Sequence, residues 1–261
     1  MAFIGSMLLF MFICLSRAKC FATVLGEQKL YAVVVDAGST GSRAFVFHKH
    51  FDASGASTVT STKCLKVKPG LSSFFSDLDS IGEYLIPLFV DAARIIPTQY
   101  LNETSIHVIG TAGMRILPED AQHDIWVAVK NELRGDSRFV FNHHLIEART
   151  IDGHHEAFCG VLSSNFVIGS IDAALVPTGR AALVGSLDMG GSSTQLTAYE
   201  GPQINPNNDA TQNVALTTDA FWSHSWIRKG MQIVRNELWA VDEVLYHSLF
   251  TTLFLYNLCC C

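Results

Sequence analysis

Two segments of this chain share one pattern: an apolar run ends in an aspartate, a loop of glycine and hydroxyl residues follows, and a second apolar run resumes. The first loop is Asp36–Arg43 (DAGSTGSR) and the second is Asp188–Gln195 (DMGGSSTQ). Because the flanking runs are rich in β-branched residues, each unit predicts two strands joined by a glycine-rich turn. The two units lie about 150 positions apart, so they predict two similar α/β domains that face each other.

Hydrophobic periodicity predicts further elements between and after these units. The expected strands are Tyr31–Val35, Ala44–Phe47, His107–Ile109, Phe139–Phe141, Ala182–Leu187 and Leu196–Tyr199. The expected helices are Ser80–Ile96, a helix opened by Pro118 that ends before Gly135, His154–Ile168 and Trp222–Trp239. The chain therefore belongs to the α/β class.

The charge balance limits the partners. With 18 Lys+Arg against 24 Asp+Glu and no basic stripe, the chain lacks the electrostatic footprint of a nucleic-acid-binding protein. An acidic protein that binds a phosphate chain must do so locally, with backbone amides and a divalent metal.

The two loops carry the chemistry of such a site. Glycine permits positive φ and close backbone approach, so successive amides can point at phosphate oxygens. Asp36 and Asp188 each end an apolar strand, where they are placed to hold a hydrated Mg²⁺ or Ca²⁺ between them. One such turn is usually only a hairpin, but two that open with aspartate indicate a phosphate site. The loops also supply hydroxyl donors, which are Ser39, Thr40, Ser42, Ser192, Ser193 and Thr194.

Two other residues are candidates for catalysis. Thr111 follows a strand, where its hydroxyl can reach a ligand; the alternative is a plain strand-to-helix turn in which Arg115 makes a structural ion pair. Glu156 falls in the first turn of an expected helix, where the helix dipole favours the ionised form that a general base needs. The alternative for Glu156 is an acidic residue that only offsets the helix terminus.

The N-terminus predicts entry into the secretory pathway. Met1–Leu15 is almost entirely apolar but short for a membrane span, so residues 1–22 are interpreted as a signal peptide or an uncleaved anchor. The final location is then the ER or Golgi lumen, the cell surface or the medium, with membrane association possible through this segment. Asn102 lies in a glycosylation sequon. Residues 241–261 form an atypical apolar tail, and the cysteine spacing indicates neither a zinc site nor a disulfide framework.

The chain resembles the ecto-nucleoside triphosphate diphosphohydrolase (apyrase) family over about residues 30–238. His224-Ser225-Trp226 is similar to the family's helix after the fourth segment. The matching segments, in the family's order, are DAGSTGSR at Asp36–Arg43, GTAGMR at Gly110–Arg115, IDGHHEAFCGVLSSNFVIG at Ile151–Gly169 and LDMGGSSTQ at Leu187–Gln195.

This resemblance implies an actin-like fold of two RNase H-like domains, the first at 28–150 and a partial second at 151–240, with nucleoside di- or triphosphate between them. It implies that Asp36 and Asp188 position Mg²⁺ or Ca²⁺ through water and that Glu156 is the base activating water for in-line attack on the terminal phosphate. Thr111, Ser193 and Gln195 are implied to position that water. The implied phosphate-binding residues are Ser39, Thr40, Gly41, Arg43, Gly190, Gly191 and Ser192.

The sequence also departs from the family pattern. Ala157 stands where the family has glycine, and Cys159 and Val161 replace aromatic residues. The family's fifth segment, expected beyond residue 261, does not occur, so we expect an incomplete second domain. Two alternatives remain open: an exopolyphosphatase-like enzyme, which His155-Glu156-Ala157 favours, and a truncated, inactive relative that only binds nucleotide. The oligomeric state is not indicated.

Overall fold

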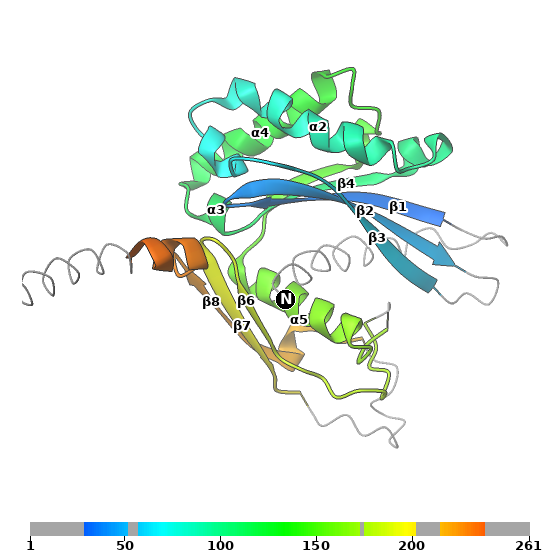
Figure 1. The fold of residues 1–261 in the computed structure, drawn as a ribbon, viewed down its shortest axis with the longest axis vertical. Coiled ribbons are helices and arrows are strands. Elements are labelled where there is room, and N and C mark those ends of the chain that lie inside the picture. The colour runs from blue at the N-terminus through cyan, green and yellow to red at the C-terminus, as the bar shows by residue number, and fades with distance from the viewer. Residues whose placement is uncertain (1–28, 52–56, 173–174, 202–214, 238–261) are drawn as a thin grey trace, which may run out of the picture.

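The computed structural model describes residues 29–51, 57–172, 175–201 and 215–237, which form two β-sheets (Figure 1). The first sheet has five strands in the order β3-β2-β1-β4-β5, and the second has three in the order β6-β7-β8. The strands are β1 (Lys29–Gly38), β2 (Gly41–Phe51), β3 (Ser57–Val67), β4 (Ser105–Gly110), β5 (Ile146–Thr150), β6 (Ser186–Met189), β7 (Ser193–Tyr199) and β8 (Phe221–Ile227).

The helices are concentrated around the first sheet. They are α2 (Ile81–Ala93), α3 (Ala112–Arg115), α4 (Glu119–Gly135) and α5 (Gly153–Val167), and residues 231–237 are also helical. Short 3₁₀ turns occur at Leu71–Phe74, Leu78–Ser80, Thr98–Glu103, His143–Leu145 and Thr218–Ala220. Within the described ranges, no helix has the length and apolar character to cross a membrane. The predicted signal segment 1–22 and the tail 241–261 lie outside the described residues.

The first sheet combines an antiparallel meander with parallel strands. β1 pairs antiparallel with β2, and β2 pairs antiparallel with β3. β1 pairs parallel with β4, and β4 pairs parallel with β5. Parallel neighbours need a crossover, and here α2 precedes β4 while α3 and α4 precede β5. The carboxyl ends of β1 and β4 consequently meet at one edge, where Asp36 and Thr111 lie.

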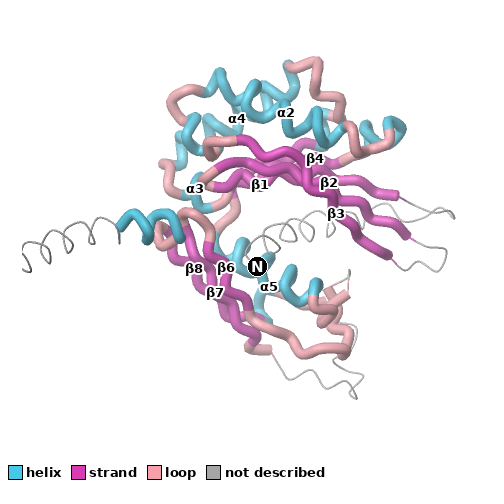
Figure 2. The backbone as a smooth tube through the Cα atoms, viewed as in Figure 1, coloured by secondary structure: helices cyan, strands magenta, loops and turns pink. Residues whose placement is uncertain are grey.

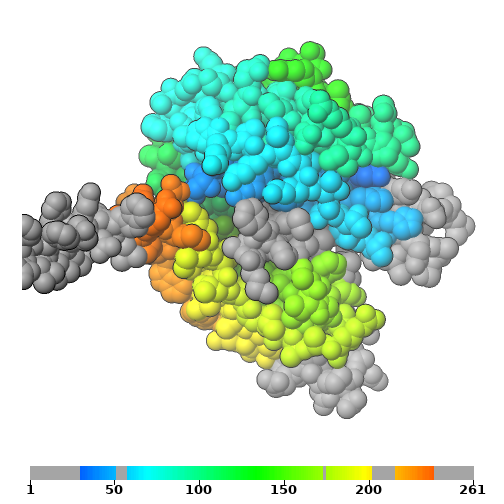
Figure 3. Space-filling model, in the orientation of Figure 1, coloured from blue at the N-terminus to red at the C-terminus, as the bar shows by residue number. Residues whose placement is uncertain are grey.

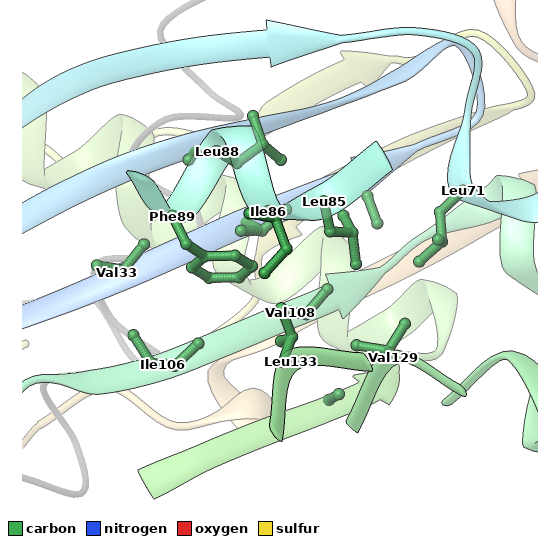
Figure 4. Packing of buried hydrophobic residues seen from close by; sticks show 14 of the residues in the cluster. Val33, Leu71, Leu85, Ile86, Leu88, Phe89, Ile106, Val108, Val129 and Leu133 are labelled. Carbon is green, nitrogen blue, oxygen red and sulfur yellow. The ribbon is translucent and has the colours of Figure 1, made fainter. Parts of the chain in front are cut away.

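Helices cover both faces of this sheet (Figure 2). α2 and α4 pack on one face over a core in which Phe89 meets Val33 and Ile106 (Figure 4). Pro87 lies inside α2 without ending it. On the opposite face, Val34, Phe45 and Ile109 pack against residues of α5. The alternation of side chains along β1 therefore supplies both cores.

α5 lies between the two sheets (Figure 1). One side of the helix joins the core under the first sheet through Cys159 and Leu162. On the other side, Thr197 of β7 donates a hydrogen bond of 3.2 Å to the carbonyl of Ala157, and Phe158 packs edge-on against Phe221 of β8. Contacts on both sides bury most of this helix, including the polar side chains of Glu156, Ser163 and Asn165. The predicted boundary at 150/151 falls between β5 and α5; the division into two domains stays a prediction.

The second sheet repeats the hairpin of the first. β6 pairs antiparallel with β7, and β7 with β8. Asp188 faces Gln195 across this hairpin, as Asp36 faces Arg43 across the first, so both loops have the same length and register. The α/β class and both predicted hairpins are confirmed.

Three of the expected elements are wrong or displaced. Trp222–Trp239 is not one helix, and His224-Ser225-Trp226 is not helical, because β8 occupies this region and only 231–237 is helical. Phe139–Phe141 is not a strand: Phe139 and Phe141 fill the core beside Phe89 from an irregular segment, and β5 follows later. The strand expected at Ala182–Leu187 begins only at Ser186.

A side chain explains the late start of β6. The Asn165 amide donates to the carbonyl of Val184 at 2.8 Å, and its carbonyl oxygen accepts from the Val184 N–H at 2.9 Å. The backbone before Ser186 therefore satisfies its hydrogen bonds with a helix side chain instead of a neighbouring strand. β3 and β5 were not expected from the sequence.

Candidate active site

A cleft of about 1050 Å³ lies between the two sheets, and both glycine loops line it. Residues of 231–237 close one side, and Figure 3 shows this segment in orange where the two parts of the molecule meet. The lining includes Asp36, Ser39, Thr40, Arg43, Thr111, Glu156, Asp188, Gly190, Gly191, Ser192 and Ser193. The structure therefore brings together nearly all of the predicted site residues.

Asp36 stands near the end of β1 and is almost completely buried. Arg43, opposite on β2, places Nη1 3.2 Å from Asp36 Oδ2. Burial raises the pKa of Asp36 to about 6, Arg43 opposes this rise, and the charge of Asp188 adds to it. Asp36 and Asp188 both line the same cleft.

Ser39, at the tip of the first loop, is enclosed by glycines from three other segments. A Cβ on Gly70 would lie 2.4 Å from the Ser39 carbonyl oxygen, and a Cβ on Gly113 would lie 2.7 Å from Ser39 Cα. A Cβ on Gly191 would lie 2.7 Å from Ser39 Oγ and 3.0 Å from Thr40 Cγ2. Glycine at these positions lets the two loops approach each other closely.

Residues 229–232 form hydrogen bonds with the second loop and its flanking strand. The N–H groups of Met231 and Gln232 donate to the carbonyls of Gly190 and Gly191 at 2.8 and 3.1 Å. Thr194 Oγ1 donates to the carbonyl of Lys229 at 2.6 Å. Because these carbonyls are engaged, the loop conformation is fixed before any ligand binds.

Glu156 lies in the first turn of α5, as predicted, with Asp152 as the N-cap. Its Oε2 is 2.8 Å from Arg115 Nη1, and both side chains are largely buried. Burial raises the pKa of Glu156 to about 7, Arg115 opposes the rise, and the charges of Asp188 and Asp36 add to it. The carboxyl group is thus poised between its two protonation states near neutral pH.

A hydrogen-bonded network extends from Glu156 into the second sheet. Gln195 Nε2 lies 3.2 Å from Glu156 Oε2, 2.6 Å from Ser193 Oγ and 3.0 Å from Ser225 Oγ. Arg115 Nη2 donates to Ser193 Oγ at 3.3 Å. Ser193 takes part in this network through its hydroxyl group and also lines the cleft.

Some predicted residues take a different place, and others were missed. Gly41, with φ of 151°, forms the hairpin turn, and neither it nor Gln195 lines the cleft. Arg115, considered only for a structural ion pair, contacts the candidate base itself. Lining residues that the sequence did not single out include Phe45, Lys63, Lys68, Met231, Gln232 and Arg235.

The carboxylates of the cleft fit a divalent cation. Among the described residues no three His, Cys, Asp or Glu side chains converge as a complete ligand set. Asp36 is buried and Asp188 is half-buried, and desolvation raises the pKa of each. Mg²⁺ is usually bound by one or two carboxylates together with water and substrate phosphates, which suits this pair.

The fold is of the actin-like class, and both glycine loops line the cleft between its two sheets. A solved nucleoside triphosphate hydrolase from Neospora caninum has a similar fold, with a TM-score of 0.56 and 17% identity over 84% of this chain and 48% of that one. The chain belongs to the GDA1/CD39 (nucleoside phosphatase) family, whose pattern matches residues 23–238. The predicted fold class and family are confirmed.

Curated relatives agree with this assignment. Ectonucleoside triphosphate diphosphohydrolase 7 from Homo sapiens is 34% identical over 191 residues, which covers 66% of this chain and 31% of that protein. Probable apyrase 6 from Arabidopsis thaliana is 29% identical over 236 residues, covering 88% and 40%. Nucleoside-triphosphatase ntp-1 from Caenorhabditis elegans is 34% identical over 176 residues, covering 65% and 31%. The chain thus spans about a third of the length of most of these relatives.

Proposed function

We propose that this protein hydrolyses nucleoside tri- or diphosphates and releases phosphate. The observation that carries the proposal is the position of Glu156, a buried carboxyl group in the same cleft as both glycine loops. A base held next to a phosphate site is the arrangement that attack by water requires. Membership of a nucleoside phosphatase family supports the substrate class.

The loops bind the phosphate chain in this proposal. Ser39 and Thr40 approach it from the first sheet, and Gly190, Gly191 and Ser192 approach from the second. Arg43 keeps Asp36 in place, so the first loop carries a fixed carboxylate at its base. Hydrogen bonds or tight glycine contacts hold both loops in one conformation, so the loops need little further ordering when nucleotide binds.

Glu156 accepts the proton of the attacking water. Its pKa of about 7 leaves a large ionised fraction at neutral pH and still makes it basic enough to take the proton. Arg115 holds the carboxylate, while Ser193, Thr111 and Gln195 orient the water and the base. No covalent intermediate with the protein is required.

Asp36 and Asp188 would hold Mg²⁺ or Ca²⁺ in the cleft. The cation would supply positive charge that neutralises the phosphate oxygens and the leaving group. The two aspartates approach the cleft from different sheets, Asp36 from β1 and Asp188 from β6.

The test is phosphate release by purified protein, with and without EDTA, in the wild type and in Glu156→Gln. The matched control is Glu119→Gln, an exposed glutamate in the first turn of α4. We expect metal-dependent release from nucleoside tri- or diphosphates, a loss of about 10²- to 10⁴-fold in Glu156→Gln, and no change in the control. Unchanged activity in Glu156→Gln would remove Glu156 from the mechanism.

Substrate comparison separates the remaining alternatives. Preference for long-chain polyphosphate over nucleotides would favour an exopolyphosphatase-like enzyme. Nucleotide binding without release of phosphate would favour an inactive relative. We also propose that residues 1–22 direct the chain into the secretory pathway; the exposed Asn102 side chain is accessible for glycosylation there.

A further inference from the structure

Three lysines gather at the end of β3, on the wall of the cleft beside the first loop. We call Lys63, Lys66 and Lys68 the lysine cluster; all three side chains are exposed, and Lys63 and Lys68 line the cleft. None of the roles assigned above involves them. In a chain with a net charge of −6, three neighbouring cations at the mouth of a site need an explanation.

A β-bulge brings Lys63 and Lys66 of the cluster to the same face of the sheet. Phe45 of β2 pairs with Lys63 of β3, and Arg43 of β2 pairs with Lys66 of β3. The two paired residues are therefore two positions apart on β2 but three positions apart on β3. In a regular strand Lys63 and Lys66 would point to opposite faces of the sheet, because side chains alternate. The extra residue places both on the face of Arg43 and Phe45, which line the cleft.

The cluster also touches the phosphate loop. A Cβ on Gly41 would lie 3.3 Å from both Lys66 Cε and Lys68 Cγ, so these two side chains pack around the turn of the first hairpin. The side chains of Lys66 and Lys68 therefore lie beside the turn that carries Ser39 and Thr40. Lysines on an edge strand also discourage pairing with another strand, but that effect requires no particular face.

The cations of this wall repel one another. The pKa of Lys66 is lowered by its partial burial and then by the charges of Arg43, Lys68 and Lys63, while Asp36 acts in the opposite direction. Crowding of like charges is unfavourable unless an anion relieves it. A ligand with several negative charges next to the first loop would do so.

We propose that the lysine cluster is a second phosphoryl-binding subsite, which holds a phosphate group beyond those gripped by the two glycine loops. The inference rests on the proposed function for the first loop and adds a wall that selects for longer or more highly charged phosphate chains. Two sources supply such a group: the phosphate chain of the substrate and the orthophosphate that is released.

The first experiment measures binding without turnover. Isothermal titration calorimetry in EDTA compares tripolyphosphate binding to the wild type, to the triple variant Lys63→Met, Lys66→Met, Lys68→Met, and to Lys130→Met on α4 as a matched control. Exposed charge pairs each contribute modestly, about two- to fivefold in affinity, so the triple variant should bind about tenfold more weakly or worse. The difference should shrink in about 0.5 M salt, because exposed charges are screened. Lys66→Arg should bind like the wild type.

The second experiment identifies the source of the group. Weaker binding of tripolyphosphate and nucleoside triphosphate, with unchanged inhibition by orthophosphate, identifies the substrate chain as the occupant. Weaker inhibition by orthophosphate identifies the departing phosphate. Equal affinities of a folded triple variant and the wild type for all three anions overturn the subsite. A wild type that hydrolyses nothing refutes the proposed function instead, and the calorimetric comparison still decides on the cluster.

Discussion

Replacing Arg115 by methionine tests whether this arginine sets the proton affinity of the proposed base. Arg115 Nη1 lies 2.8 Å from Glu156 Oε2, and both side chains are largely buried. A hydrogen bond to a charged partner contributes about 1.5–3 kcal/mol. At 1.36 kcal/mol for each pKa unit, its loss raises the pKa of Glu156 by about 1–2 units. The pKa would then move from about 7 to roughly 8 or 9.

The consequence for activity depends on pH. At pH 7 the ionised fraction of Glu156 would fall from about one half to between about a tenth and a hundredth. Phosphate release at pH 7 should therefore fall about 5- to 50-fold in Arg115→Met and recover toward the wild-type value near pH 9. The assay is the pH profile of kcat at saturating nucleotide and metal. Arg115→Lys keeps the positive charge and should leave the midpoint of the profile near that of the wild type.

One result would refute this reasoning. Arg115 also contacts Ser193 Oγ and the carbonyl of Ile151. A loss of activity that is the same at every pH would show that Arg115 acts by holding these groups in place and leaves the proton affinity of Glu156 unchanged.

Three further predictions concern stability and the fit of the loops. Asp36 and Glu156 bind protons more tightly in the folded protein than in the unfolded chain, because their pKa values in the folded protein are about 6 and about 7. In EDTA the free energy of unfolding should therefore fall as pH rises from about 4 to about 7, by at most about 3 kcal/mol for each of the two carboxyl groups. Urea denaturation between pH 4 and 8 measures the free energy of unfolding, and Mg²⁺ or Ca²⁺ should restore most of the lost stability at pH 8. A free energy of unfolding that does not change with pH would contradict the raised pKa values. Gly191→Ala should raise KM for nucleotide about fivefold or more, because the new methyl group meets Ser39. The control is Gly135→Ala, in which the new methyl group has no other atom within 4 Å, so KM should stay unchanged. Phe89→Ala should lower the free energy of unfolding by about 3–5 kcal/mol in denaturant titrations, since Phe89 is fully buried against Phe139 and Phe141; a loss below about 1 kcal/mol would contradict this packing.

The parts of the fold that the sequence predicted are those with local signals. Both hairpins combine β-branched runs with glycine-rich turns, and each forms at the expected loop. Glu156 was expected in the first turn of a helix and lies there, because Asp152 caps α5 by accepting from the His155 N–H at 2.7 Å. These features depend on residues within a few positions of one another.

The errors came from side chains whose burial depends on distant partners. Trp222–Trp239 was expected to be a helix, yet Trp222 and Trp226 lie on strand β8, are 42% and 40% exposed, and point away from α5. Small residues face the helix instead, and a Cβ on Gly153 would overlap Ser225 Oγ. Phe139 and Phe141 suggested a strand but fill a core from an irregular segment. Size and hydrophobicity do not reveal which face a residue takes when its partner lies far along the chain.

The same limit applies to the site. The loops and Glu156 were recognisable because each carries a local pattern. The pairing of Arg115 with Glu156 joins residues 41 positions apart in sequence. Lys63 and Lys66 share one face of the sheet only because of a bulge that no local sequence signal reveals.

The matched register of the two hairpins has a consequence for the direction of the reaction. Asp36 faces Arg43, and Asp188 faces Gln195 at the corresponding position. Two identical hairpins would offer a linear phosphate chain the same groups at both ends. The exchange of a cation for an amide makes the two loops chemically different, and Gln195, the amide, contacts Glu156. Under the proposed function, we therefore expect a phosphate chain to bind in one direction.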